Sequence, residues 1–108
     1  MKFLVIVEGI PGGVPMSPEQ FLGLNKAQWA WAKAMKDKGR AEVAYALADH
    51  AGGLMGGFGI VNCASLEQLA EDLATMPAVG RSNVKVYPLV APEVAEKIVE
   101  AGLARLPK

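Results

Sequence analysis

Ser17-Pro18-Glu19-Gln20 and Ser65-Leu66-Glu67-Gln68 are the two stretches that decide the fold of this chain. In each, a serine is followed three residues later by a glutamine, which is the spacing of a capping box at the start of a helix. In the first stretch a proline occupies the first helical position, where no intrahelical hydrogen bond is lost. Two helices are therefore predicted to begin at nearly identical signals.

Four strands are predicted around these two helices. Lys2–Glu8 precedes the first helix, Ala41–Ala48 and Leu54–Asn62 lie between the helices, and Val84–Leu89 follows the second. Branched and aromatic residues in these runs favour strands. The resulting order, β-α-β-β-α-β, is that of a ferredoxin-like α+β fold, whose single sheet has one face that its own helices do not cover.

The helix ends and the last segment complete the prediction. The first helix is expected to end near Lys38, ahead of Gly39, and the second near Thr75. The 108 residues form a single ferredoxin-like domain, 1–108, with a C-terminal helical extension over 90–108 that Gly102 is expected to stop. Because this extension has an apolar stripe, it is expected to pack on its own sheet or on a neighbouring subunit.

The composition indicates which classes of partner the chain is expected to bind. Hydrophobic residues make up 52%, which is high for so small a domain and predicts a homodimer or a larger homo-oligomer. Eleven basic and eleven acidic residues balance, and the basic residues form no run or stripe. Binding to nucleic acid or to a membrane surface is therefore not expected. No segment approaches the ~20 apolar residues of a membrane span, no signal peptide is evident, and Cys63 is alone. A soluble, cytoplasmic protein is expected.

A resemblance to a known family rests on scaffold motifs. These are the proline-led first helix, Lys38-Gly39-Arg40, the glycine-rich third strand, and Ser65–Leu69 with Met76-Pro77 closing the second helix. On these features, from Lys2 to about Tyr87, the chain resembles the dimeric α+β-barrel superfamily and, within it, the muconolactone isomerase family. The resemblance implies two sheets packed face to face across a dimer, and proton transfer without a cofactor on a small lactone or enol. No catalytic residue of the family matches one-to-one, so none is carried over.

His50 and Glu8 are the first candidates for proton transfer. His50 is the single histidine, lies in a turn after Asp49, and is the side chain whose ordinary pKa is nearest neutrality. The alternative is a solvated turn residue. Glu8 ends the first strand and shares a face with Leu4 and Ile6, where a carboxylate at the mouth of an apolar cavity could move a proton. The alternative is a strand-end charge that reaches water or pairs with a cation.

Further candidates lie on the strands and the first helix. Tyr45 and Tyr87 are candidate catalytic hydroxyls that could polarise a substrate oxygen, although strand aromatics are more often core. Gln28, Trp31 and Phe58 are candidate substrate-binding residues. Gln28 falls within the buried stripe of the first helix, where its amide either finds structural partners or meets a bound carbonyl.

The functional prediction is a small isomerase of the muconolactone isomerase type. Its substrate would lie in an apolar pocket between the sheet and the first helix, roofed by Ile10–Met16. No metal site is expected, since the chain has one histidine and one cysteine, and neither G-x-G-x-x-G nor a Walker A loop occurs, so no cofactor is expected. The alternatives are a non-catalytic binding or assembly module and a cofactor-free monooxygenase of the same superfamily.

Overall fold

The arrangement of helices and strands follows the predicted order. A computed structural model describes residues 1–9, 15–48, 50–51 and 54–107. The elements are β1 (Lys2–Gly9), α1 (Pro18–Asp37), β2 (Ala41–Ala48), β3 (Leu54–Asn62), α2 (Leu66–Ala74), β4 (Ser82–Leu89) and α3 (Pro92–Ala104). The predicted ferredoxin-like α+β fold, with an extra C-terminal helix, is confirmed.

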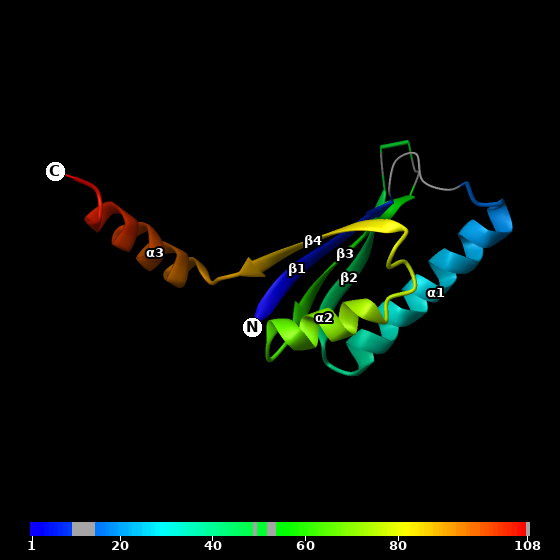
Figure 1. Cartoon of the computed structure of the whole chain (residues 1–108), viewed down its shortest axis with the longest axis horizontal. Helices are drawn as coiled ribbons and strands as arrows, with labels where there is room; N and C mark the ends of the chain where they lie inside the picture. The colour runs from blue at the N-terminus through cyan, green and yellow to red at the C-terminus, as the bar shows by residue number, and fades with distance from the viewer. Residues whose placement is uncertain (10–14, 49, 52–53, 108) are drawn as a thin grey trace.

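One four-stranded sheet forms the centre of the molecule. Its strand order is β2-β3-β1-β4, and every neighbouring pair is antiparallel. Helices α1 and α2 lie on the same side of the sheet (Figure 1). The opposite side, which we name the open face, has no helix over it in the described chain.

The core lies between the sheet and these two helices. Phe3 and Val5 of β1 point toward the helices and are buried, as are Met35 of α1, Val61 of β3 and Leu69 of α2. Since Phe3 and Val5 alternate with half-buried residues along β1, the period-two pattern of a strand determines which side chains enter the core. This layer fixes the side of the sheet against which α1 packs.

The two helix starts are capped in slightly different ways. At α1, Ser17 Oγ accepts from Gln20 N at 3.1 Å and Gln20 Oε1 accepts from Ser17 N at 3.0 Å, which completes the predicted capping box. At α2, Ser65 Oγ accepts from Gln68 N at 3.1 Å, but Gln68 Oε1 accepts from Ala64 N at 2.7 Å. The second glutamine therefore bonds one residue earlier than in a full capping box.

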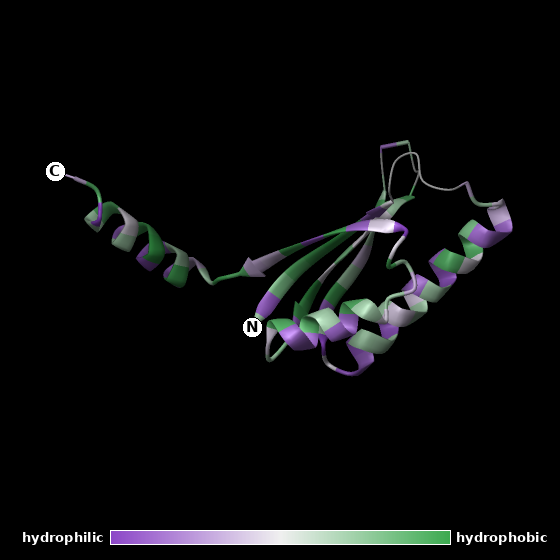
Figure 2. Cartoon of the chain, viewed as in Figure 1, coloured by the Kyte–Doolittle hydropathy of each residue, from purple (hydrophilic) through white to green (hydrophobic). Residues whose placement is uncertain are grey.

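The open face carries a row of apolar side chains across the sheet. Ile6 of β1 is paired with Phe58 of β3 and with Lys85 of β4, so the three share this face. Leu4 is likewise paired with Ile60 and Tyr87. Figure 2 shows hydrophobic residues along these strands. The face is therefore largely apolar although no helix covers it.

The last helix departs from the expectation in one respect. Gly102 does not stop α3, which continues to Ala104 and ends ahead of Pro107. A glycine inside a helix costs only about 1 kcal/mol, whereas a proline disfavours helical geometry in the residue before it. Helix α3 extends away from the sheet (Figure 1), along a molecule with extents of 61 × 31 × 23 Å. In the described part of the chain no helix is long and apolar enough to span a membrane.

Candidate functional site

A cavity of about 680 Å³ lies between α1 and the helix-facing side of the sheet. Its lining comes mainly from β1, α1, β2 and β3, with residues of α2, of the start of β4 and of the segment between them. This is the location in which the sequence predicts a substrate pocket. The predicted roof is Ile10–Met16, of which residues 10–14 lie outside the described residues, while Met16 does line the cavity.

The cavity exists because the sheet offers little side-chain volume under one part of α1. Ala44 and Ala46 of β2 are paired with Gly59 and Gly57 of β3, and all four line the cavity. Paired residues of an antiparallel sheet share a face, so these small residues form one continuous floor. Larger residues at these positions would fill the space against the helix.

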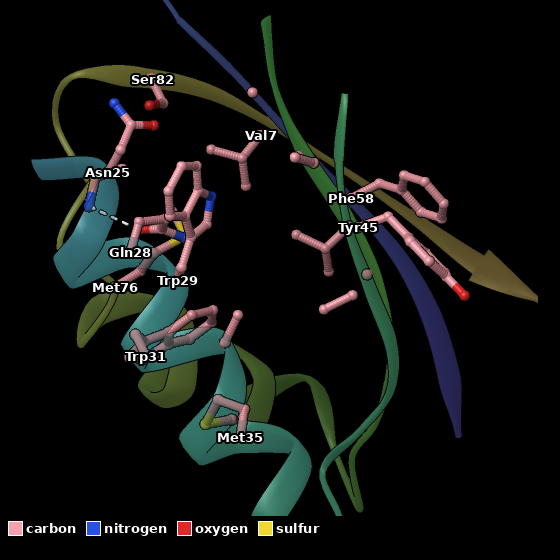
Figure 3. A pocket seen from close by; sticks show the side chains of 18 of the residues that line it. Val7, Asn25, Gln28, Trp29, Trp31, Met35, Tyr45, Phe58, Met76 and Ser82 are labelled. Atoms are coloured by element: carbon pink, nitrogen blue, oxygen red, sulfur yellow. Dashed lines mark hydrogen bonds between the residues drawn. The ribbon is translucent and has the colours of Figure 1, made fainter. Parts of the chain in front are cut away.

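Two tryptophans of α1 form much of the opposite wall. Figure 3 shows Trp29, Trp31 and Met35 extending from α1 toward the sheet, with Val7 of β1 facing them. Trp31 is held in place by a hydrogen bond from its Nε1 to Thr75 Oγ1 at 2.9 Å. Trp29 also lines this cavity and remains 45% exposed.

Gln28 supplies an amide of defined orientation in this apolar wall. Its Oε1 accepts a hydrogen bond from the backbone N–H of Ala78 at 3.0 Å (Figure 3). A backbone N–H can be met only by an acceptor, so the amide oxygen must face Ala78 and the NH₂ group is the other end. Among the described residues none accepts a hydrogen bond from Gln28 Nε2. The half-buried side chain is therefore a donor beside the cavity.

A few polar groups from α1 and from the start of β4 also line the cavity. Asn25 Nδ2 donates to the carbonyl of Phe21 at 2.8 Å, which orients that amide along the helix. Ser82, Arg81 and Lys33 also line the cavity. The lining is therefore mostly apolar with a few polar groups, which is the usual character of a small-molecule site.

A separate polar cluster lies deeper in the fold, where α2 meets the start of β2. The guanidinium of Arg40 pairs with Asp72, whose Oδ2 is buried and meets no hydrogen-bond donor among the described residues. Burial raises the pKa of the nearby Cys63 thiol, and the charge of Asp72 raises it further, while Arg40 opposes this. None of these three residues lines the cavity.

Two of the three predicted substrate-binding residues reach the cavity with their side chains. Gln28 and Trp31 do so from α1. Phe58 and Tyr45 are also among the residues that line the cavity, but Figure 3 shows their side chains pointing away from it, on the open face. There the two rings stack with centroids 5.7 Å apart. Whether Phe58 binds substrate stays a prediction.

The remaining predicted residues lie on the open face or in the turn beyond β2. Glu8 is half-buried and is paired with Gly56, and Tyr87 is half-exposed on β4. His50 is exposed in the turn after β2, and Asp49 lies outside the described residues. In the described part of the chain the cavity lining includes neither Glu8, His50 nor Tyr87. Their catalytic roles remain predictions.

The floor of the cavity was missed in the sequence. Ala44 and Ala46 alternate with Val43 and Tyr45, and Gly57 and Gly59 alternate with larger residues in the same way. This pattern of very small residues on one face of a predicted hairpin could have indicated a hollow. In the described residues no group of three or more histidine, cysteine, aspartate or glutamate side chains is placed to hold a metal ion.

Comparison with known proteins adds a family and a fold. The model of the YCII-related domain family matches residues 1–92. No curated protein sequence matches the chain. The C-terminal helix lies beyond the matched region except for Pro92.

Two solved structures share the fold. One is 5-chloro-2-hydroxyhydroquinone dehydrochlorinase from Burkholderia phenoliruptrix AC1100 in complex with 2,5-dihydroxybenzoquinone, at 18% identity and a TM-score of 0.68, covering 87% of this chain and 98% of that one. The other is muconolactone isomerase, at 21% identity and a TM-score of 0.69, covering 85% of this chain and 92% of that one. The predicted resemblance to muconolactone isomerase is thus confirmed as a likeness of fold.

Proposed function

This chain belongs to the YCII-related domain family, and we propose that it is a small enzyme that moves a proton on a lactone or another enolisable compound without a cofactor. The observation that carries the proposal is the Gln28 NH₂ group beside an apolar cavity with two tryptophans. A substrate carbonyl directed at Gln28 Nε2 would have its developing negative charge stabilised by this donor.

The shape of the cavity supports a small, planar, oxygenated ring as the substrate class. Trp29 and Trp31 provide broad apolar surface, and the Ala/Gly floor permits close approach to the sheet backbone. The two proteins of shared fold are a muconolactone isomerase and a dehydrochlorinase bound to a dihydroxybenzoquinone. Compounds of this kind are therefore the first probes for this chain.

Glu8 and His50 are the proposed proton-transfer groups. Val7 and Gly9, the chain neighbours of Glu8, line the cavity, and so does Leu54, which lies beyond the turn that carries His50. Both candidates thus belong to the end of the sheet that the cavity reaches. Tyr45 and Tyr87 lie on the open face, on the other side of the sheet from the cavity, so their hydroxyls would act as donors only to a substrate bound on that face.

Pairing of two chains through the open face is also proposed. Ile6, Phe58 and Ile60 present apolar surface there, and Tyr45 and Tyr87 are 64% and 50% exposed. A second copy would remove this surface from water, as in the dimeric α+β barrels. Glu8, Tyr45 and Tyr87 would then face the partner chain.

A binding module without catalysis is the second candidate. It is favoured by one observation, that neither Glu8 nor His50 lines the cavity in the described chain. Under this alternative the cavity would take up a ligand and leave it unchanged.

Binding is tested with the two tryptophans, both of which line the cavity. Muconolactone is expected to change the tryptophan fluorescence of the wild-type chain. Gln28→Glu keeps an oxygen for Ala78 N–H and removes the NH₂ donor, so it should weaken binding at least ~10-fold. Gln20→Glu, which makes the same chemical change in the capping box of α1, is the matched control and should bind normally.

Turnover is tested by ultraviolet absorbance and by solvent deuterium uptake into muconolactone. Glu8→Gln and His50→Ala should each lower turnover at least ~100-fold if these residues act as acid or base. Glu71→Gln, on the exposed side of α2, is the control and should leave turnover unchanged. Binding without turnover or exchange would favour the binding module. If muconolactone is neither bound nor turned over, the proposed substrate class is refuted.

A further inference from the structure

Helix α3 is an amphipathic helix that its own chain does not cover. None of its residues is buried, and Ile98, Val99 and Leu103 are 58%, 61% and 62% exposed. At 100° per residue, Val94, Ile98 and Val99 fall on one stripe, which we name the α3 stripe. Exposed apolar surface arranged in a stripe indicates a missing partner.

The helix also lacks local stabilisation. It has 13 residues, and its N-cap, Ala91, makes no side-chain capping bond. An isolated helix of about this length is marginal in water, so most of its stability must come from tertiary packing. We therefore expect α3 to be helical because it packs on another surface.

The chain's own body does not provide that surface. Val90 and Ala91 alone separate the end of β4 from Pro92, the first residue of α3. Figure 1 shows that α3 leads away from the sheet, and no hydrogen bond or ion pair joins it to the body in the described chain. The stripe is thus available to another molecule.

The charges of α3 indicate which class of molecule its partner belongs to. Its polar side carries Glu93, Glu96 and Glu100 against Lys97. This acidic balance disfavours both nucleic acid and an anionic lipid surface, which attract basic helices. A protein surface is the remaining class.

The open face of the sheet indicates which protein this is. Exposed apolar residues follow one another along the chain from Tyr87 and Leu89 of β4, through Val90, to Val94 and Ile98 of α3. The α3 stripe therefore begins a few residues beyond the proposed pairing surface, so a partner that covers the end of β4 is close to the start of α3. A second copy of this chain would present the same two surfaces in return.

We propose that α3 is an exchanged arm, which packs through Val94, Ile98 and Val99 against the body of a second copy of this chain. The inference rests on the sheet-face pairing proposed above and adds a contact made by residues beyond the family's matched region. Each chain of the dimer gives one arm and receives one, so the contact closes with two-fold symmetry.

The test compares two glutamate substitutions in the full chain, Ile98→Glu in the α3 stripe and Lys97→Glu on the polar side of the same helix. Sedimentation velocity reports the oligomer, and hydrogen exchange of the α3 amides over a dilution series reports whether the arm is docked. In the wild type, α3 should be protected in the dimer and lose protection as the dimer dissociates. Ile98→Glu should abolish this protection and raise the dissociation constant at least ~10-fold, and Lys97→Glu should change neither appreciably.

The outcomes separate the arm from the sheet pairing. A dimer whose α3 amides exchange freely at every concentration overturns the arm and leaves the sheet pairing intact. Protection of α3 that does not change on dilution, in a chain that sediments as a monomer, means that the helix packs on its own body and overturns the arm. A monomer with unprotected α3 overturns both the arm and the pairing.

Discussion

The backbone N–H of Ala78 meets Gln28 Oε1, and this contact determines which end of the amide remains free. From the sequence, Gln28 belongs to the buried stripe of α1, with its amide held by structural partners or available to a ligand. In the structure the oxygen has a structural partner, while the nitrogen stays unengaged among the described residues. At the scale of single residues, one long-range hydrogen bond thus divides the side chain into a fixed half and an available half.

Cys63 gives a prediction about pH. Its pKa is raised by burial and by the charge of Asp72, so the folded chain holds the thiol proton more tightly than the unfolded chain, whose cysteine has a pKa of about 8.5. This stabilisation is present below that value and is lost as the pH rises toward the folded pKa. The free energy of unfolding, measured with urea, should therefore fall less steeply at alkaline pH in Cys63→Ala than in the wild type.

The comparison of the two slopes removes the contribution of lysines and tyrosines, which both chains share. Native Cys63 should also react slowly with iodoacetamide at neutral pH, because the thiolate is the reactive form. Parallel slopes together with fast alkylation would contradict the prediction.

At the scale of elements, β3 shows why a strand can be rich in glycine. Glycine within a strand often marks a bulge, a bend or a close approach of backbone. Gly56 has φ +146°, with a register shift opposite it, between Leu47 and Ala48. A Cβ atom on Gly56 would lie 1.9 Å from the carbonyl oxygen of Val7. Gly57 and Gly59 instead serve the floor of the cavity. The strand therefore uses glycine for backbone geometry at one end and for space along its middle.

Two glycine-to-alanine substitutions should have opposite effects on stability. Gly56→Ala places a methyl group against backbone at a φ unsuited to L-residues, and it should destabilise the fold by about 3 kcal/mol or more. Gly23→Ala lies within α1 with no atom near its new Cβ, and it should stabilise the fold by about 0.5–1 kcal/mol. Thermal and urea unfolding measure both. A stable Gly56→Ala would mean that β3 does not hold this geometry.

At the scale of the whole molecule, the chain has three apolar surfaces that its own described residues do not cover. The cavity lies on the helix side of the sheet, the open face lies on the other, and α3 leaves the sheet at the end of β4. The high hydrophobic content noted in the sequence is accounted for by the second and third of these, because both expose apolar side chains. Assembly would cover these surfaces and leave the cavity to a ligand.

Pairing through the open face can be broken without touching the cavity. Ile6→Lys adds a charge to the centre of this face, and it should convert the dimer to a monomer at concentrations where the wild type is paired. Leu22→Lys adds the same charge on an exposed position of α1 and should leave the dimer intact. Sedimentation velocity compares them, with circular dichroism to verify folding. An Ile6→Lys dimer as tight as the wild type would refute the pairing surface.

By itself the sequence determined the order of the elements, the start of α1 at Ser17, the end of that helix ahead of Gly39, and the alternation that groups Val43 with Tyr45. These features depend on residues close together in the chain, whose capping, turn and periodicity preferences can be read locally. The stop expected at Gly102 was wrong because a single glycine is too weak a signal to end a helix.

Only the tertiary structure decided which face of the sheet the helices cover. That choice directs Gln28 and Trp31 to the cavity and Phe58 to the opposite side, joins Gln28 to Ala78, and leaves α3 without a partner in its own chain. Alternation along a strand separates two faces without saying which is buried, since that depends on contacts between residues far apart in the sequence.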